Sequence, residues 1–442
     1  MPALNDLLST VLERGARLID WRGGGKATPE ALAARCAELL SSKGEATGVA
    51  LAAGILEGYG RLERDGRRAF FEAICMDYDP DPAALTAAAQ RYGAERSSAS
   101  LAALNKAAEP RRQELFRRLN LAPGGTRRLV RMREDLLQFL PAEPEFARID
   151  ADFRHLLGSW FNRGFLVMER IDWHTPAAIL EKIIAYEAVH QINNWDELRL
   201  RVDPDDRRCF AFFHPSMPDE PLVFVEVALT RETPGSIQAV LESDRARVDP
   251  RTATTAVFYS ISTCQEGLRG VSFGAFLIKQ VAEDLARELP KLETFVTLSP
   301  VPGFARWLEA EAKADPDLPE ARALSRVQAE GWAADAKRSE AVKAALLPLA
   351  ARYFLDARRK DGQPPDPVAR FHLGNGAELM DIHWLGDSSP KGMAQSYGIM
   401  VNYLYDLDRI EENHEAYAAE GRVIASRKLR SLAATARKGN AA

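Results

Sequence analysis

The sequence changes character near residue 150, and this change constrains the fold more than any other feature. Before it, alanine, leucine, glutamate and arginine dominate, and apolar residues recur at helical spacing, as in Leu8, Val11 and Leu12. This first part has no segment with strand character. After it, short apolar runs alternate with amphipathic stretches. We therefore predict an α+β protein with two domains: an all-helical domain over residues 1–150 and a mixed α/β domain over residues 151–442.

The residue pattern of the second part predicts an ordered series of strands and helices. Apolar runs bounded by turn residues predict strands at 208–214, 222–230, 257–263, 294–298, 368–373 and 378–384. Helical periodicity predicts helices at 176–190, 273–289 and 303–312, and a helical insertion at about 317–360. The glycines of Gly374-Asn-Gly376 supply hairpin-turn chemistry between the last two strands.

Composition excludes several kinds of partner. The chain has 58 basic and 63 acidic residues, a formal net charge of -5, so we expect no nucleic-acid partner and no attraction to anionic membranes. No window reaches the roughly 20 apolar residues of a membrane span. Asp6 and Glu13 interrupt the leucines that a signal peptide would need. Four widely separated cysteines favour a reducing compartment, so we expect a cytoplasmic protein without a zinc site.

A glycine-rich loop, Gly267–Gly274, joins an expected strand to an expected helix. Its glycines allow close backbone approach, and the N–H groups at the start of the helix can bind an anion, with Arg269 adding a charged contact. The alternative is a glycine-rich turn without a ligand. The loop resembles the coenzyme A loop of GCN5-related acetyltransferases, although Gly267 and Ser272 depart from the usual pattern of that family.

One serine and one histidine stand out, but spacing alone does not make them catalytic. Ser299 follows an expected strand, where open α/β sheets place ligands and catalytic groups. A serine before a proline-rich helix start is more often a cap or turn former. His372 lies between apolar neighbours on an expected strand, where a structural role is the commoner one. His214 ends another expected strand and is a rival, and His383 can face either side of its strand.

Several blocks, in one order along the chain, resemble the malonyl-CoA decarboxylase family. They occupy residues 122–126, 159–166, 188–190, 220–230, 258–262, 274–279, 298–304, 371–377 and 402–403. The likeness covers most of the chain from Asp152 onward, and many blocks in order are more specific than any one motif. It implies a helical oligomerisation domain followed by an acetyltransferase-like domain, and a homo-oligomer, either a dimer or a tetramer. It also implies a carboxy-lyase that converts malonyl-CoA to acetyl-CoA and carbon dioxide with no metal or organic cofactor.

The resemblance also implies which residues form the site. The catalytic serine and histidine of the family fall on Ser299 and His372, which we expect to engage the malonyl carboxylate and to protonate the enolate. Tyr403 and His214 are second candidates without a role. The acyl-CoA loop of the family falls on Arg269, Gly270, Val271, Ser272, Phe273, Gly274 and Ala275. Two alternatives stay open: an acetyltransferase that uses the same coenzyme A site, and an acyl-CoA-binding protein without catalysis.

Overall fold

The computed structural model describes residues 28–42, 44–271, 277–315, 318–329 and 331–439, and these form two compact units. The first unit comprises Met1–Val167, Phe213–Glu220 and Gln265–Phe273. The second comprises Met168–Phe212, Pro221–Cys264 and Gly274–Ala442. Two short segments from the later part of the chain therefore belong to the first unit. The domain boundary expected at residue 150 stays a prediction.

The first unit is helical wherever the structure describes regular elements outside its two short segments. Aromatic side chains fill its core, where Phe71 packs against Tyr59, Phe139 and Phe146. Helices α2, α5 and α6 begin at residues whose side chains cap the helix, as at Thr28 before Pro29. The helices are α2 (Pro29–Ser41), α3 (Glu45–Gly60), α4 (Arg64–Asp77), α5 (Pro82–Glu95), α6 (Ser98–Ala108), α7 (Arg111–Asn120), α8 (Gly125–Phe139) and α9 (Ala147–Trp160), with short turns η1 (Pro144–Phe146) and η2 (Arg163–Phe165).

The second unit is built on a mixed eight-stranded sheet in the order β1-β2-β3-β4-β5-β8-β6, with β7 beside β8. Only β4 and β5 pair in parallel, and they do so over the first four residues of β4; the other pairs with a determined register are antiparallel. Beyond Phe258, β4 is therefore no longer bonded to β5. The strands are β1 (Val167–Ile171), β2 (Arg207–Phe213), β3 (Val223–Thr230), β4 (Thr255–Thr263), β5 (Thr294–Thr297), β6 (Ser299–Pro300), β7 (Glu378–His383) and β8 (Met400–Leu404).

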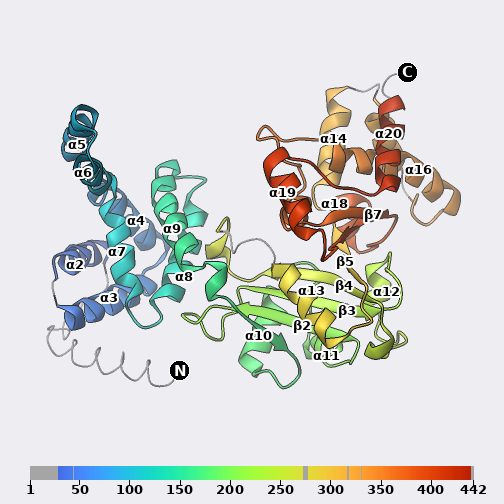
Figure 1. The fold of residues 1–442 in the computed structure, drawn as a ribbon, viewed down its shortest axis with the longest axis horizontal. Coiled ribbons are helices and arrows are strands. Elements are labelled where there is room, and N and C mark those ends of the chain that lie inside the picture. The colour runs from blue at the N-terminus through green and yellow to red at the C-terminus, as the bar shows by residue number, and fades with distance from the viewer. Residues whose placement is uncertain (1–27, 43, 272–276, 316–317, 330, 440–442) are drawn as a thin grey trace. The chain divides into compact units, whose positions relative to one another are not determined.

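Helices of the second unit gather around two parts of this sheet (Figure 1). Those near β2–β4 are α10 (Ala177–Tyr186), α11 (Trp195–Val202), α12 (Ile237–Leu241) and α13 (Leu277–Glu288). Those near β7 are α14 (Phe304–Ala314), α16 (Ala336–Leu355), α18 (Pro390–Ser396), α19 (Ile410–Glu420) and α20 (Arg427–Gly439), and the set also includes α15 (Pro319–Val327) and α17 (Pro367–Gly374). Short turns η3 (Pro250–Thr252) and η4 (Glu266–Leu268) flank β4.

The prediction of a helical part followed by a mixed α/β part is confirmed. The likeness of the second part to acetyltransferases stays a prediction. Strands lie where the sequence predicted them at 208–214, 222–230, 257–263, 294–298 and 378–384, within two residues at each end. The strand predicted at 368–373 is wrong, because this segment is helix α17. Asp366 accepts hydrogen bonds from the backbone of Val368 and Ala369, and Pro367 occupies the first turn, so a capped helix start replaces the predicted hairpin strand.

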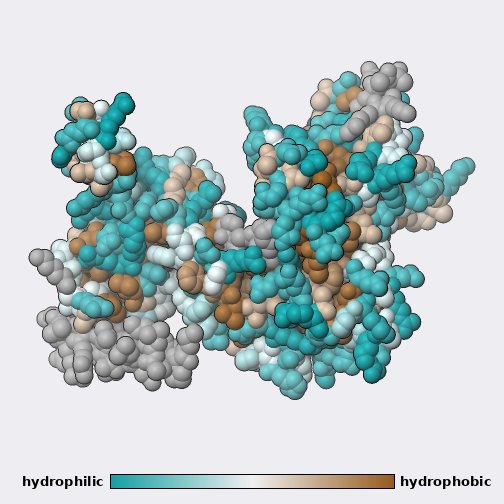
Figure 2. All heavy atoms as spheres, viewed as in Figure 1, coloured by the Kyte–Doolittle hydropathy of each residue, from teal (hydrophilic) through white to brown (hydrophobic). Residues whose placement is uncertain are grey.

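Apolar side chains lie mainly inside the two units. On the face shown in Figure 2, hydrophilic residues predominate and hydrophobic residues show as smaller patches among them. A buried cluster that includes Val257, Val296, Leu298 and Met400 holds β4, β5 and β8 together. This packing fixes the backbone immediately before Ser299. Within the described ranges, no helix combines the length and the apolar character that crossing a membrane requires.

Candidate active site

Ser299 is fixed where β5 gives way to β6. It follows Leu298 of the buried cluster and pairs with Val401 of β8, so its backbone is held on both sides. Its buried hydroxyl donates a hydrogen bond of 2.8 Å to Oγ1 of Thr297. The next helix, α14, is preceded by Gly303 and has no side-chain cap. The interpretation of Ser299 as a helix cap is therefore wrong.

His372 reaches Ser299 from the last turn of α17. Its Nε2 lies 3.2 Å from Oγ of Ser299, although 73 positions separate the two residues in the sequence. The ring is buried and stacks on Tyr403, with the ring centroids 4.5 Å apart and an interplanar angle of 23°. The structure thus brings together the serine and the histidine singled out in the sequence, and one second candidate, Tyr403, packs against the histidine.

Two further residues contact this pair and were not found from the sequence. Oη of Tyr405 lies 2.8 Å from Nδ1 of His372. Thr297 accepts hydrogen bonds from the hydroxyl of Ser299 and from the backbone N–H of Tyr403. A usable signal existed for Tyr405, because residues 403 and 405 share one side of an extended chain. No comparable signal marks Thr297 among the threonines.

The hydrogen bonds define the proton positions of the resting site. Burial lowers the pKa of His372 to about 3, so its imidazole is neutral near pH 7. Burial also raises the pKa of Tyr405 far above its ordinary value, so its phenol keeps its proton. Among the described residues, the only hydrogen-bond partner of that phenol is Nδ1 of His372. We therefore assign Nδ1 as the acceptor, and the Nε2–H faces Ser299.

A cavity of about 210 Å³ opens beside the pair. Apart from Ser299 and His372, its described lining is mostly apolar and includes no lysine or arginine: Val189, Phe258, Tyr259, Ile261, Thr263, Pro300, Pro367, Val368 and Phe371. A charged group that enters this cavity exchanges water for a lining that is mostly hydrocarbon and has few polar side chains. In addition, no cluster of three or more histidine, cysteine, aspartate or glutamate residues in the described ranges could hold a metal ion.

The other predicted histidine, His214, lies in the first unit. Its Nδ1 is 2.6 Å from Oγ of Ser216 and its Nε2 is 3.1 Å from the backbone oxygen of Trp160. Its ring packs on Phe161 at 4.8 Å. Both ring nitrogens therefore already have local partners, which gives His214 a structural role. His383 bonds to the side-chain oxygen of Asn402 through Nε2.

The predicted acyl-CoA loop is described only in part. Arg269, Gly270 and Val271 lie in the first unit, whereas Ser272, Phe273, Gly274 and Ala275 lie outside the described residues. Gly270 has a φ of 75°, in the region that favours glycine. The side chain of Arg269 is 65% exposed and lies 3.6 Å from a carboxylate oxygen of Glu266. Its role in binding an acyl-CoA stays a prediction.

The start of this loop is attached to α8 by a buried arginine. Arg133 donates to the backbone oxygens of Gly267 and Arg269, at 2.8 and 2.9 Å, and Asp150 holds its Nε at 2.8 Å. Gly267 lies so close to α8 that an added Cβ would be 1.9 Å from the backbone oxygen of Val130. Only glycine fits at this position without displacing the loop or the helix.

We expect Gly267→Ala to lower the free energy of unfolding by about 1–3 kcal/mol, because the methyl group overpacks the contact with Val130. Denaturant titration followed by circular dichroism measures the change. The matched control is Gly158→Ala, since an added Cβ at Gly158 in α9 would meet no atom within 4 Å. That variant should gain up to about 1 kcal/mol from helix propensity. Equal stabilities for the two variants would contradict the predicted close contact.

Comparison with known proteins agrees with this geometry. Residues 78–161 match the malonyl-CoA decarboxylase N-terminal domain, and residues 164–442 match the malonyl-CoA decarboxylase C-terminal domain. The chain belongs to the malonyl-CoA decarboxylase family. It is 38% identical to the mitochondrial malonyl-CoA decarboxylase of Anser anser anser over 351 residues, which are 73% of this chain and 69% of that protein. For the enzyme of Rattus norvegicus the identity is 37%, over 75% of this chain and 73% of that protein.

Solved structures of bacterial members are also similar to this chain over nearly its whole length. Malonyl-CoA decarboxylase from Rhodopseudomonas palustris has 53% identity and a TM-score of 0.88. The enzyme from Agrobacterium vitis has 54% identity and a TM-score of 0.86. Each comparison covers 91% of this chain and 99% of the other. The family likeness first seen as scattered sequence blocks therefore extends through both units.

Proposed function

We propose that this protein decarboxylates malonyl-CoA to acetyl-CoA and carbon dioxide, with Ser299 and His372 as its catalytic pair. Family membership supports the reaction. The observation that carries the residue assignment is the 3.2 Å approach of His372 Nε2 to Ser299 Oγ at the wall of a mostly apolar cavity. Both side chains are buried apart from this cavity, so a substrate inside it would meet few other polar groups.

The apolar lining promotes loss of carbon dioxide. A malonyl carboxylate in the cavity would accept from the Ser299 hydroxyl, once this turns from Thr297, and would meet no cation among the described lining residues. Its charge is therefore poorly stabilised in the ground state. As the carbon–carbon bond breaks, the electron pair moves into the thioester and leaves a neutral carbon dioxide molecule, which suits an apolar wall. The cavity thus favours the products of bond cleavage over the bound carboxylate.

His372 completes the reaction by protonating the enolate. A neutral imidazole that carries its proton on Nε2 can donate it to a strongly basic carbon. Tyr405 supports this direction of transfer, because its O–H points to Nδ1 and stabilises the negative charge that grows on the ring. Once the proton has reached the carbon, solvent restores it to the site. One proton is consumed for each carbon dioxide released, which balances the reaction.

We place the coenzyme A diphosphate at the loop from Arg269 to Ala275. The exposed Arg269 guanidinium and the left-handed glycine Gly270 support this proposal. Backbone N–H groups of such a loop and a cationic side chain together suit a diphosphate. The attachment of the loop to α8 through Arg133 would limit how far it moves when a ligand binds.

Incubation of the purified protein with malonyl-CoA alone should yield equal amounts of acetyl-CoA and carbon dioxide. In D₂O, mass spectrometry should find one deuterium incorporated into the acetyl methyl group at each turnover. Malonate without coenzyme A is the control and should release nothing. An acetyltransferase would need an acceptor amine, and a binding protein would retain malonyl-CoA unchanged. Intact malonyl-CoA after prolonged incubation would therefore exclude the proposed reaction.

A further inference from the structure

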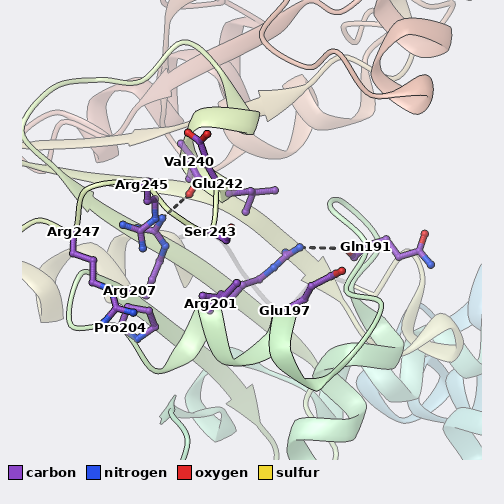
Figure 3. A pocket seen from close by; sticks show the side chains of 12 residues that line it. Gln191, Glu197, Arg201, Pro204, Arg207, Val240, Glu242, Ser243, Arg245 and Arg247 are labelled. Atoms are coloured by element: carbon purple, nitrogen blue, oxygen red, sulfur yellow. Dashed lines mark hydrogen bonds between the residues drawn. The ribbon is translucent and has the colours of Figure 1, made fainter.

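A second cavity in the second unit is lined by four arginines. Its volume is about 340 Å³, and the arginines are Arg201 on α11, Arg207 on β2, and Arg245 and Arg247 after α12. Figure 3 shows Arg207 reaching toward Val240 and Arg201 reaching toward Gln191. None of the residues that line this cavity lines the cavity beside Ser299.

Arg207 is the decisive residue, because it is a buried cation without a carboxylate in hydrogen-bond contact. Its side chain is 4% exposed, and its guanidinium donates to the backbone oxygens of Asp206 and Val240, at 3.1 and 2.5 Å. Asp206 forms only a long ion pair with it, at 3.8 Å, and the guanidinium carbon lies 6.0 Å from the ring centroid of Tyr259. The Asp206 carboxylate already accepts two bonds from Arg245, at 2.5 and 2.9 Å, and one from the N–H of Val248. Burial of a cation in this state is costly.

None of the other charged groups that line the cavity gives Arg207 a carboxylate in hydrogen-bond contact. Arg201 is paired with Glu226 at 2.9 Å. The carboxylate of Glu197 accepts bonds from the backbone and side-chain N–H groups of Asn193, next to the N-cap Asn194 of α11, so it is engaged at the start of the helix. Glu242 is exposed at the rim. Arg247 is also exposed and forms no ion pair with any residue in the described ranges.

We propose that this cavity binds a small anion with at least two negative charges, carried by phosphate or carboxylate oxygens. Arg207 would supply charge at the base of the cavity, and Arg247 would add a second guanidinium from the rim. Both guanidinium groups have the planar fork that matches phosphate and carboxylate oxygens. The volume suits a small metabolite. The anion would occupy the arginine-lined cavity and not the cavity beside Ser299, so this proposal is separate from the proposed decarboxylation.

Isothermal titration calorimetry on the full chain tests the proposal with three probes: inorganic phosphate, pyrophosphate and citrate. We expect saturable binding of at least one probe with a stoichiometry near one at low ionic strength. Preference for pyrophosphate would indicate a phosphorylated ligand, and preference for citrate would indicate a polycarboxylate. Arg207→Met and Arg247→Gln should each weaken that binding about tenfold or more, the effect of losing one charge-assisted contact.

The control is Arg251→Gln, which also removes an exposed charge a few residues further along the chain but lies outside the cavity lining. It should leave the affinity unchanged within about twofold. If Arg207→Met does not fold, Arg247→Gln still decides, because its side chain is at the surface. Absent binding of all three probes, or equal weakening by the control, would overturn the proposal. Neither result would affect the proposed decarboxylation, because the readout is binding and not turnover.

Discussion

A protein carrying His372→Asn is expected to decarboxylate malonyl-CoA about 10²–10⁴-fold more slowly than the unchanged chain, which is the usual value of a positioned acid. Asparagine keeps a polar group at the end of α17 but cannot accept from Tyr405 and pass a proton to the substrate. Steady-state kinetics should show the loss in kcat, with KM changed much less, since the histidine acts on the reacting carbon and not on coenzyme A. An unchanged kcat would refute the assignment.

The control is His174→Asn, an exposed histidine outside the cavity lining, which should keep full activity. The pH profile provides a second check. Because burial holds the pKa of His372 at about 3, its neutral form predominates throughout the range in which the protein can be assayed. The profile of kcat/KM should therefore show no break near 6.5, the ordinary pKa of histidine. A break there, lost in His372→Asn, would mean that the ring is solvated and works as an imidazolium.

Much of the sheet could be predicted because central strands such as β2 and β3 are buried on both faces. Continuous apolar runs such as Val223–Thr230 are typical of central strands, and turn residues mark where they end. The prediction of a strand around His372 was wrong for a reason that lies in the local sequence. Apolar neighbours favoured a strand, although Asp366 and Pro367 form a helix-start signature that competes with this pattern. A helix places His372 one turn from its C-terminal end, where it can reach Ser299.

Features that depend on contacts between distant segments of the chain could not be predicted from local sequence patterns. The segments 213–220 and 265–273 belong to the first unit through contacts such as those of Arg133 with Gly267, which no local pattern encodes. The pairing of Ser299 with His372 was inferred from family likeness, and the structure supplied the distance. Tyr405 and Thr297 became candidates for the site only because the structure shows their hydrogen bonds to His372 and Ser299. Self-association, cytoplasmic location and independence from cofactors stay predictions.

The second large effect is expected from Ser299→Ala, which should lower kcat by about 10²–10³-fold, the usual cost of removing one preorganised hydrogen-bond donor. The serine hydroxyl is the hydrogen-bond donor that we assign to the malonyl carboxylate. It also accepts the hydrogen bond from the Nε2–H of His372. Its loss should therefore reduce both alignment of the substrate and delivery of the proton. Single-turnover measurements with excess protein separate this chemical step from product release.

Ser325→Ala is the matched control, because that serine lies on α15, its hydroxyl bonds only the backbone of Arg322 among the described residues, and it does not line the cavity. The double variant Ser299→Ala with His372→Asn adds a sharper criterion. If the two residues act on one proton-transfer step, the double variant should be little slower than the slower single variant. Fully multiplicative losses would mean that the serine and the histidine act independently, and that the 3.2 Å contact between them is structural.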